Sequence, residues 1–290
     1  SPDAAQSVIC LAFWACGSQI YDMTTATDVA DVFESIAPQE IGVPGDQLGF
    51  LYGDPTTSVS GVACLWNIHT MSLAECAERG LNMLICHEGI WMPEQTSPWY
   101  DAPEPQHIHA NVARRALLDE HEFVVYRSHS NWDALTVDGV RDQAIAALGI
   151  DGLRPIAERK FFSVLELPAP LSVTDLLRLA ESGLGYSGCR VFGDAEKQIR
   201  RFSFLIGGFG ENQFHMPQVA RDLGAEAVII GEMSEFIVIS CLEMGLPVIE
   251  TLHSVSEIPA IRRQADLLTE RLPDLRVEYV PSGATAFHQP

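Results

Sequence analysis

The chain has 290 residues, 47% of them hydrophobic and 20% charged, so it can bury the core of one large domain or two small ones. Its 18 Lys and Arg residues against 39 Asp and Glu residues give a formal net charge of −21. This charge would repel nucleic-acid phosphates and anionic membrane surfaces, so we expect neither as a partner.

The first 22 residues contain the most apolar early stretch, Val8 to Gly17. This stretch is about half the length that crosses a bilayer, and no basic n-region precedes it. Met23 stands directly before the first predicted helix. We therefore interpret residues 1–22 as an N-terminal extension without an assigned function, and residues 23–290 as a single domain.

The cysteines indicate reduced thiols, because their number is odd and none forms a CxxC pair. They are Cys10, Cys16, Cys64, Cys76, Cys86, Cys189 and Cys241. A thiolate at Cys86 could ligate a metal, but its place at the end of an apolar run favours a buried, inert thiol. The pattern predicts a cytoplasmic protein.

Apolar periodicity predicts alternating helices and strands from residue 24 onward. A helix at 24–36 is followed by strands at 47–52, 59–65, 81–86 and 122–126, with helices at 72–79 and 107–120. In the second half, strands are predicted at 161–166, 191–192, 201–206, 227–230 and 247–251, and helices at 172–182, 213–223, 235–244 and 257–271. This order predicts an α/β fold of two related halves, about 23–155 and 156–290, with largely parallel or mixed sheets and a cleft between them.

His87 and Glu88 directly follow the strand predicted at 81–86. Adjacent residues of a strand point to opposite faces, so both can ligate a metal only if the strand has ended, which Gly89 permits. The alternative is a histidine at the strand end with a solvated glutamate.

A polar loop containing His129, Asn131 and Asp133 follows the strand predicted at 122–126. Asn131 and Asp133 could form only an Asx turn. Ligands of parallel sheets bind outside the carboxyl ends of the strands, and this placement favours a functional loop.

His253 and Glu257 follow the strand predicted at 247–251. Their spacing brings the two side chains to one face of a helix or across a strand-to-helix turn. The alternative is a capping box formed by Ser254 and Glu257, which needs no metal.

The three segments supply two imidazoles and three carboxylates, enough for two divalent ions with open positions for water. These side chains are His87, Glu88, Asp133, His253 and Glu257. Nitrogen and oxygen ligands of this kind suit Mn, Fe, Zn or Co. The glycine-rich segment 207–210 could cradle a phosphate, although a tight turn is the favoured interpretation because no Lys-Ser/Thr follows it.

At these residues the chain resembles the Nif-three-like dinuclear metal centre family, whose members are often called GTP cyclohydrolase type two. Residues 46–53 are similar to an early Asp-Asn-x-Gly-x-x-x-Gly segment, 84–91 to a strand ending in His-His-Pro, and 129–133 to His-Thr-Asn-Leu-Asp. Residues 224–232 are similar to Gly-Ala-Asp-x-x-x-Thr-Gly-Glu, and 253–257 to the closing His-x-x-x-Glu. The resemblance runs from about residue 24 to 283.

The resemblance implies metal ligation by His87, Asp133, His253 and Glu257, with Glu88 at the position of the family's second histidine. A carboxylate there either shifts the preference toward Mn or Fe or leaves one metal position weak. The resemblance also implies two α/β halves and a ring-shaped hexamer.

The expected function is a metal-dependent hydrolase acting on a small molecule, namely a cyclic amide, an N-heterocycle or a nucleotide-like compound. The catalytic candidates are His129, as a proton donor or acceptor, and Glu232, as a substrate or water contact. The alternatives are a loop-ordering histidine and a glutamate at a helix N-terminus, where the dipole favours it. The competing function is a non-catalytic metal-binding chaperone or regulatory scaffold.

Overall fold

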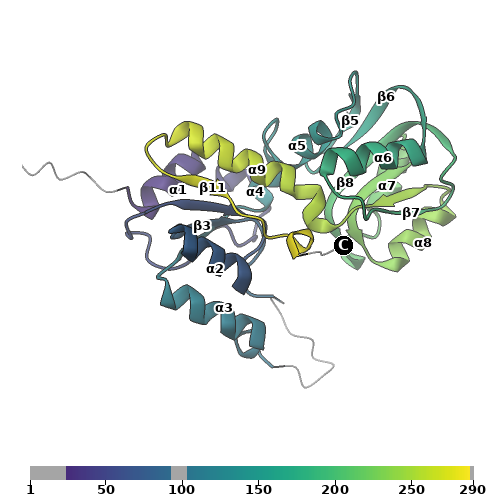
Figure 1. The fold of residues 1–290 in the computed structure, drawn as a ribbon. Helices are drawn as coiled ribbons and strands as arrows, with labels where there is room; N and C mark the ends of the chain where they lie inside the picture. The colour runs from purple at the N-terminus through teal and green to yellow at the C-terminus, as the bar shows by residue number, and fades with distance from the viewer. Residues whose placement is uncertain (1–23, 93–102, 288–290) are drawn as a thin grey trace, which may run out of the picture.

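The computed structural model describes residues 24–92 and 103–287, and these residues form two lobes, each built on one β-sheet (Figure 1). The predicted extension at 1–22 lies outside the described residues. No helix among the described residues is long and apolar enough to pass through a bilayer. The five cysteines within the described ranges are free thiols. The cytoplasmic location stays a prediction.

The first sheet has five strands in the order β1-β4-β3-β2-β11. They are β1 (Gly49–Tyr52), β2 (Val62–Leu65), β3 (Met83–Cys86), β4 (Val124–Arg127) and β11 (Val277–Tyr279). All neighbours are parallel except β1, which is antiparallel to β4. Every residue of β2, β3 and β4 is buried, as expected for parallel strands covered on both faces.

Helices cover both faces of this sheet. On one face α1 (Ala26–Glu34) and α9 (His253–Arg271) pack against side chains of β2, β3 and β4. On the other face lie α2 (Thr70–Arg79) and α3 (His109–Glu120). The short helix α4 (Ser130–Ala134) follows β4 directly.

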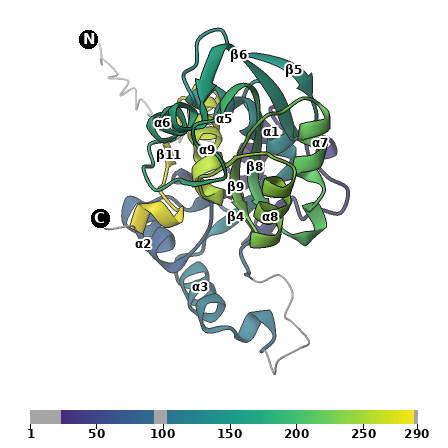
Figure 2. The ribbon, with the colours of Figure 1, turned by 90° about the vertical axis from the view of Figure 1, so that its right-hand side faces the viewer.

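The second sheet is mixed and has six strands in the order β5-β6-β8-β9-β10-β7. They are β5 (Arg154–Glu158), β6 (Phe162–Ser172), β7 (Arg190–Phe192), β8 (Gln198–Phe209), β9 (Val228–Met233) and β10 (Val248–Glu250). The central strands β8, β9 and β10 are parallel, and the outer pairings are antiparallel. Figure 2 shows this lobe with its helices on either side.

One face of the second sheet is covered by α5 (Val140–Ala147) and α6 (Val173–Leu184). The other is covered by α7 (Met216–Asp222) and α8 (Glu235–Glu243). Within the described residues, four short 3-10 helices complete the elements, η1 (Gln39–Ile41), η2 (Pro105–His107), η3 (Glu211–Gln213) and η4 (Ala284–Phe287). The predicted α/β fold class with two largely parallel or mixed sheets is confirmed.

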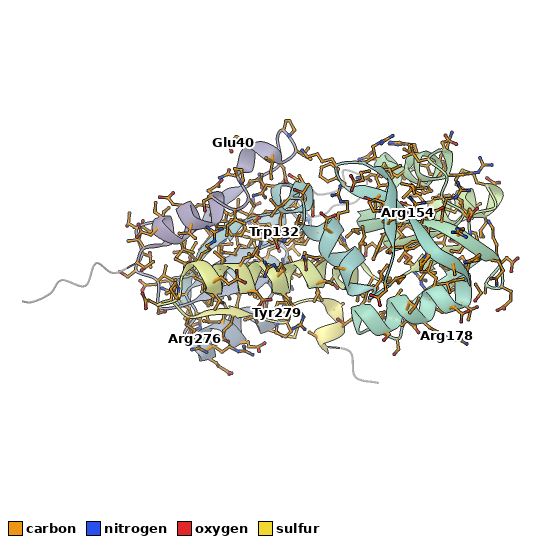
Figure 3. All side chains as sticks on the ribbon, turned by 90° about the horizontal axis from the view of Figure 1, so that it is seen from above. Glu40, Trp132, Arg154, Arg178, Arg276 and Tyr279 are labelled. Atoms are coloured by element: carbon orange, nitrogen blue, oxygen red, sulfur yellow. The ribbon has the colours of Figure 1, made fainter. Side chains whose placement is uncertain are left out.

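The predicted division into 23–155 and 156–290 is corrected by the path of the C-terminal segment. Residues 154–250 build the second sheet, and the chain then returns, because β11 adds to the β2 edge of the first sheet. Helix α9 makes the crossing and contacts both sheets. Its apolar face, with Ala260, Ile261 and Leu268, fills the core beneath α1. Figure 3 shows α9 lying along the first lobe, with one end at the second lobe.

Candidate metal centre

His87 and Glu88 leave the carboxyl end of β3, where the strand has ended as the metal interpretation required. Their backbone N–H groups donate to the carbonyls of Leu65, at 3.1 Å, and Trp66, at 2.9 Å. These bonds tie the turn to the end of β2. Both side chains therefore reach one cluster with Glu257 instead of lying on opposite faces of a strand.

The ring of His87 is fully buried and held in one orientation. Its Nδ1 lies 3.0 Å from the carbonyl oxygen of Ser128, which can only accept, so Nδ1–H is the donor. The other nitrogen, Nε2, is left to bind a proton or a metal. It lies 3.4 Å from Asp133 Oδ1 and 3.5 Å from Glu257 Oε2.

His253 and Glu257 lie one turn apart on α9, and this face turns toward His87. The helix begins at His253, so Ser254 lies inside its first turn, and the residue before the helix, Leu252, makes no side-chain capping bond. The alternative of a capping box formed by Ser254 and Glu257 is therefore wrong. Glu257 is buried and directed into the cluster.

Glu257 joins two sets of donor atoms. Its Oε2 faces His87, and its Oε1 lies 3.3 Å from His253 Nε2. That same His253 nitrogen lies 3.3 Å from Glu88 Oε1. Ligand atoms at roughly 2.0 to 2.2 Å from one ion are themselves about 3.0 to 3.5 Å apart, and the separations here match this spacing.

Among the described residues, two groups of side chains could hold a metal ion. They are His87, His129 and Asp133, and His87, Glu88 and Glu257. Two buried atoms of these groups, His87 Nε2 and Glu88 Oε1, have no hydrogen-bond partner. A buried polar atom without a partner costs about 1 to 3 kcal/mol, and coordination would satisfy both atoms. The donor set therefore fits a divalent metal.

The carboxylates of the site also favour positive charge nearby, either protons on the histidines or a bound cation. Burial opposes protonation of His87 and His253, but Glu257 and the neighbouring acids outweigh it and raise their pKa values to about 9 and about 11. Burial raises the pKa of Asp133 to about 6, although the histidines His87 and His129 oppose the change. Without a metal, protons on the imidazoles balance the acids.

Two further side chains support the cluster and were not identified from the sequence as site residues. The indole Nε1–H of Trp66 donates to Glu257 Oε2 at 2.6 Å, and its ring meets that of His253 edge to face at 5.4 Å. The carboxylate of Asp46 accepts from His129 Nδ1 at 2.8 Å and from Arg127 at 2.8 Å. Trp66 could have been found from its position in the sequence, since it directly follows β2 at the edge of the sheet where the ligand candidates lie.

A family model described as Duf34/NIF3 (NGG1p interacting factor 3) matches residues 24–285. The chain belongs to the Duf34/NIF3 family. It is 25% identical over 262 residues to a "GTP cyclohydrolase 1 type 2 homolog" of Clostridium perfringens, a match that covers 88% of this chain and 95% of the relative. A protein of the same name from Clostridium acetobutylicum is 24% identical over 241 residues, covering 81% and 85%.

The fold of this NIF3 family member is also found among solved structures. The Bacillus cereus protein related to NIF3 superposes with a TM-score of 0.75 and 14% identity, covering 92% of this chain and 98% of that protein. At this identity the likeness establishes the fold alone.

The two catalytic candidates of the NIF3 chain lie beside the cluster. His129 Nε2 is 4.0 Å from Asp133 Oδ2, and its ring meets that of His87 at 4.9 Å. Glu232 lies on β9, so the alternative of a glutamate at a helix N-terminus is wrong. Its Oε1 is 3.7 Å from His253 Nδ1. The catalytic roles of His129 and Glu232 stay predictions.

Gly207 and Gly208 lie within β8, so the phosphate-loop and tight-turn interpretations are both wrong. A Cβ atom on Gly208 would lie 2.8 Å from His253 Nδ1, and one on Gly207, whose φ is +86°, would lie 2.7 Å from Glu257 Oε1. These glycines let the strand pass directly against the ligand candidates. The glycine-rich sequence correctly indicated an unusual backbone at this segment. Its role is to leave room for the side chains of the ligand candidates, and not to bind a phosphate or form a turn.

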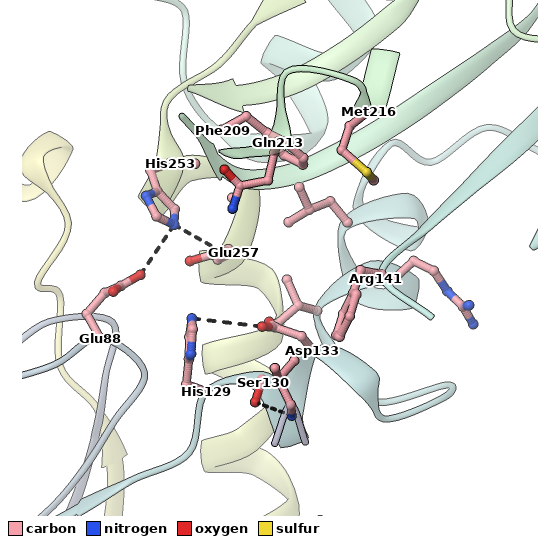
Figure 4. Close-up of a pocket in the computed structure, with 16 residues that line it drawn as sticks. Glu88, His129, Ser130, Asp133, Arg141, Phe209, Gln213, Met216, His253 and Glu257 are labelled. Carbon is pink, nitrogen blue, oxygen red and sulfur yellow. Dashed lines mark hydrogen bonds and ion pairs between the residues drawn. The ribbon is translucent and has the colours of Figure 1, made fainter. Parts of the chain in front are cut away.

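A cavity of about 410 Å³ opens beside the cluster (Figure 4). Glu88, His129, Asp133, His253 and Glu257 line it on one side. The remaining lining comes from both lobes and is largely apolar. A small molecule in this cavity would therefore lie against the candidate ligands.

Proposed function

We propose that this member of the Duf34/NIF3 family is a metal-dependent hydrolase that opens a ring at an amide or amidine C–N bond. The observation that supports this most is Glu257, whose two oxygens face different histidines beside a cavity of about 410 Å³. A shared carboxylate in this position suits a pair of divalent ions. When bound, such ions polarise a carbonyl and acidify a water molecule.

His87, Asp133 and Glu257 would hold one ion, and Glu88, His253 and Glu257 would hold the other. A carboxylate at Glu88 in place of an imidazole favours Mn or Fe over softer ions. Glu232, beside the outer nitrogen of His253, orients that ring and contacts the substrate or a water.

His129 moves the proton. Asp46 fixes its Nδ1–H, which leaves Nε2 as the atom that can accept a proton on the side of Asp133. The water oxygen bonds to the ring carbon while Nε2 accepts its proton, and the proton then passes to the nitrogen as the C–N bond breaks. The products are a ring-opened amine with a carboxyl group from a cyclic amide, and a ring-opened amine with a carboxamide from a cyclic amidine.

The test removes metal with a chelator, reloads the full chain with Mn, Fe, Zn or Co, and measures ring opening of cyclic amides and N-heterocycles. We expect turnover only after reloading. His129→Gln should keep its metal and lose about 10²-fold or more in kcat, as removal of a general base does. Loss of metal in this variant would make His129 a ligand instead.

Bound metal without turnover on any substrate would overturn the hydrolase proposal. It would favour the competing function, a non-catalytic metal-binding chaperone or scaffold. Ions that leave only when the protein unfolds would point the same way, because a purely structural site couples metal to folding.

We also propose that the chain forms the ring-shaped hexamer that the family resemblance implies. Light scattering should then give a mass in solution six times the 31.8 kDa of one chain. The mass of a single chain would overturn this.

A further inference from the structure

Apart from the candidate ligands, most of the cavity lining is an apolar wall. It is formed by Val43, Val140, Phe161, Ile206, Phe209 and Met216. These side chains come from both lobes, and two of them present aromatic rings. Such a wall binds an apolar or ring-shaped part of a ligand by burying its surface, and it offers a charged group neither an ion pair nor a hydrogen bond.

Cations are nearly missing from this wall. All 18 Lys and Arg residues of the chain lie within its described residues, and Arg141 alone lines the cavity. Its guanidinium bonds the carboxylate of Asp142, at 2.7 and 3.2 Å, and the carbonyl of Arg159, at 2.8 Å. In Figure 4 it leads away from the candidate ligands. This cation is therefore already paired.

Lys160, next to the lining residue Phe161, is the nearest other cation in sequence to the cavity wall. Its Nζ donates to the carbonyl of Gly42 at 3.1 Å and lies over the Phe161 ring, 5.4 Å from its centre. Both contacts would be lost if Lys160 turned toward a phosphate.

The centre itself offers no excess positive charge. Four carboxylates, those of Glu88, Asp133, Glu232 and Glu257, surround it. They balance the four positive charges of two divalent ions, and the molecule as a whole carries −21. A triphosphate would add several negative charges to a site that has no excess positive charge, so electrostatic repulsion would oppose its binding.

Gln213 supplies one polar group of the wall. Its Oε1 accepts from the backbone N–H of Gly210 at 3.2 Å, which identifies the other end of the amide as the NH₂ group. In Figure 4 this nitrogen is directed toward the candidate ligands. No described residue accepts a hydrogen bond from it, so it is available to a ligand carbonyl.

We infer that the cavity selects an uncharged cyclic amide or imide with an apolar substituent, whose ring carbonyl accepts from Gln213, and not a nucleoside triphosphate. This inference rests on the proposed hydrolase function for the site itself. It deepens that function by naming the substrate class. The substituent lies against Phe161, Phe209 and Met216.

The test measures binding by calorimetry to the metal-loaded full chain, so its outcome is independent of turnover. The probes are 5-phenylhydantoin, its para-carboxylate analogue and GTP, with metal content checked after each titration. We expect the neutral probe to bind at least tenfold more tightly than either anion. Gln213→Leu should weaken the neutral probe about tenfold at unchanged metal content, as loss of one hydrogen bond predicts.

Gln218→Leu is the matched control, since Gln218 is exposed on α7 and does not line the cavity. It should leave binding unchanged. Tighter binding of GTP, weakened in Lys160→Gln, would overturn the inference, as would absence of binding by the neutral probe or no effect of Gln213→Leu. Selective binding of the neutral probe without turnover would overturn the proposed hydrolase but keep the inferred ligand class. Turnover of GTP would support the hydrolase and overturn the inferred ligand class.

Discussion

Glu257 has an unusual position for a single side chain, since its two oxygens face His87 and His253 and one of them also accepts from Trp66. Burial favours the protonated form of Glu257, but the two histidines hold its pKa well below the ordinary value. It is therefore a carboxylate throughout the neutral range, fixed in direction by the indole. A bridging ligand needs both properties.

Trp66→Phe tests the contribution of the indole N–H. The phenyl ring can still pack on His253, but Glu257 loses its donor and with it a fixed orientation. Partners of metal ligands typically contribute 10- to 100-fold to affinity, so we expect metal affinity to fall by about that factor. A competition titration with a chromophoric chelator measures it.

Trp91→Phe is the control, because Trp91 packs against Tyr52, with ring centres 6.2 Å apart, at the core between the first sheet and helices α2 and α3. Its metal affinity should match that of the unchanged chain. Equal affinity in the two variants would show that the Trp66 bond does not matter.

The ligand candidates could be predicted because each polar side chain interrupts a pattern at the end of a buried strand. His87 and Glu88 after β3, and Asp133 after β4, carry that signal. Trp66 also follows a buried strand, but a tryptophan there is ordinary core chemistry, so only the contact with Glu257 gives it a role.

At the scale of elements, the strand ends were predictable and the long-range pairings were not. β11 has three half-buried residues, too few for a periodic signal, and its place depends on the free edge of β2. β5 is exposed along most of its length, so its sequence also lacks the apolar pattern that would predict a strand. The close approach of β8 to α9 needs Gly208, whose purpose appears only once His253 is in place.

Gly208→Ala should disturb the centre through that approach. The new Cβ would lie 2.8 Å from His253 Nδ1, a contact that forces the ring or the strand to move. We expect the ion held by His253 to be lost or bound at least tenfold more weakly, with near-native secondary structure. Metal content and circular dichroism check this together.

Gly210→Ala provides the comparison two residues away. Its Cβ would meet only Gln213 Oε1, at an ordinary 3.9 Å. Normal metal content in this variant and a deficit in Gly208→Ala are expected, and equal metal content in both would contradict the role given to β8.

At the scale of the whole molecule, the candidate centre lies where α9 joins the two lobes. His87, Glu88 and Asp133 belong to the first lobe, and Glu232 belongs to the second. The buried His87 and the half-buried His253 lie next to these carboxylates, which couples metal binding to proton binding.

Metal loading should therefore release protons. In the metal-free protein the pKa values of His87, about 9, and His253, about 11, keep both imidazoles protonated at pH 7. A metal binds the neutral ring, so loading at pH 7 should release about two protons per chain, and affinity should fall as the pH falls. Below about pH 6, protonation of Asp133 adds to the loss.

Calorimetry in buffers with different ionisation enthalpies measures the protons released. Affinity that stays constant between pH 8 and pH 6, with no proton release, would contradict the charge balance described here.

The most direct test of the shared carboxylate is elemental analysis of the loaded chain beside Glu88→Gln, Glu257→Gln and the exposed control Glu243→Gln. We expect about two ions per chain in the unchanged protein and the control, as a two-metal site requires. Glu88→Gln should retain about one ion per chain. Glu257→Gln should retain fewer ions than Glu88→Gln. All variants should give the circular dichroism spectrum of the folded protein. Two ions retained in folded Glu257→Gln would contradict a centre built on that carboxylate.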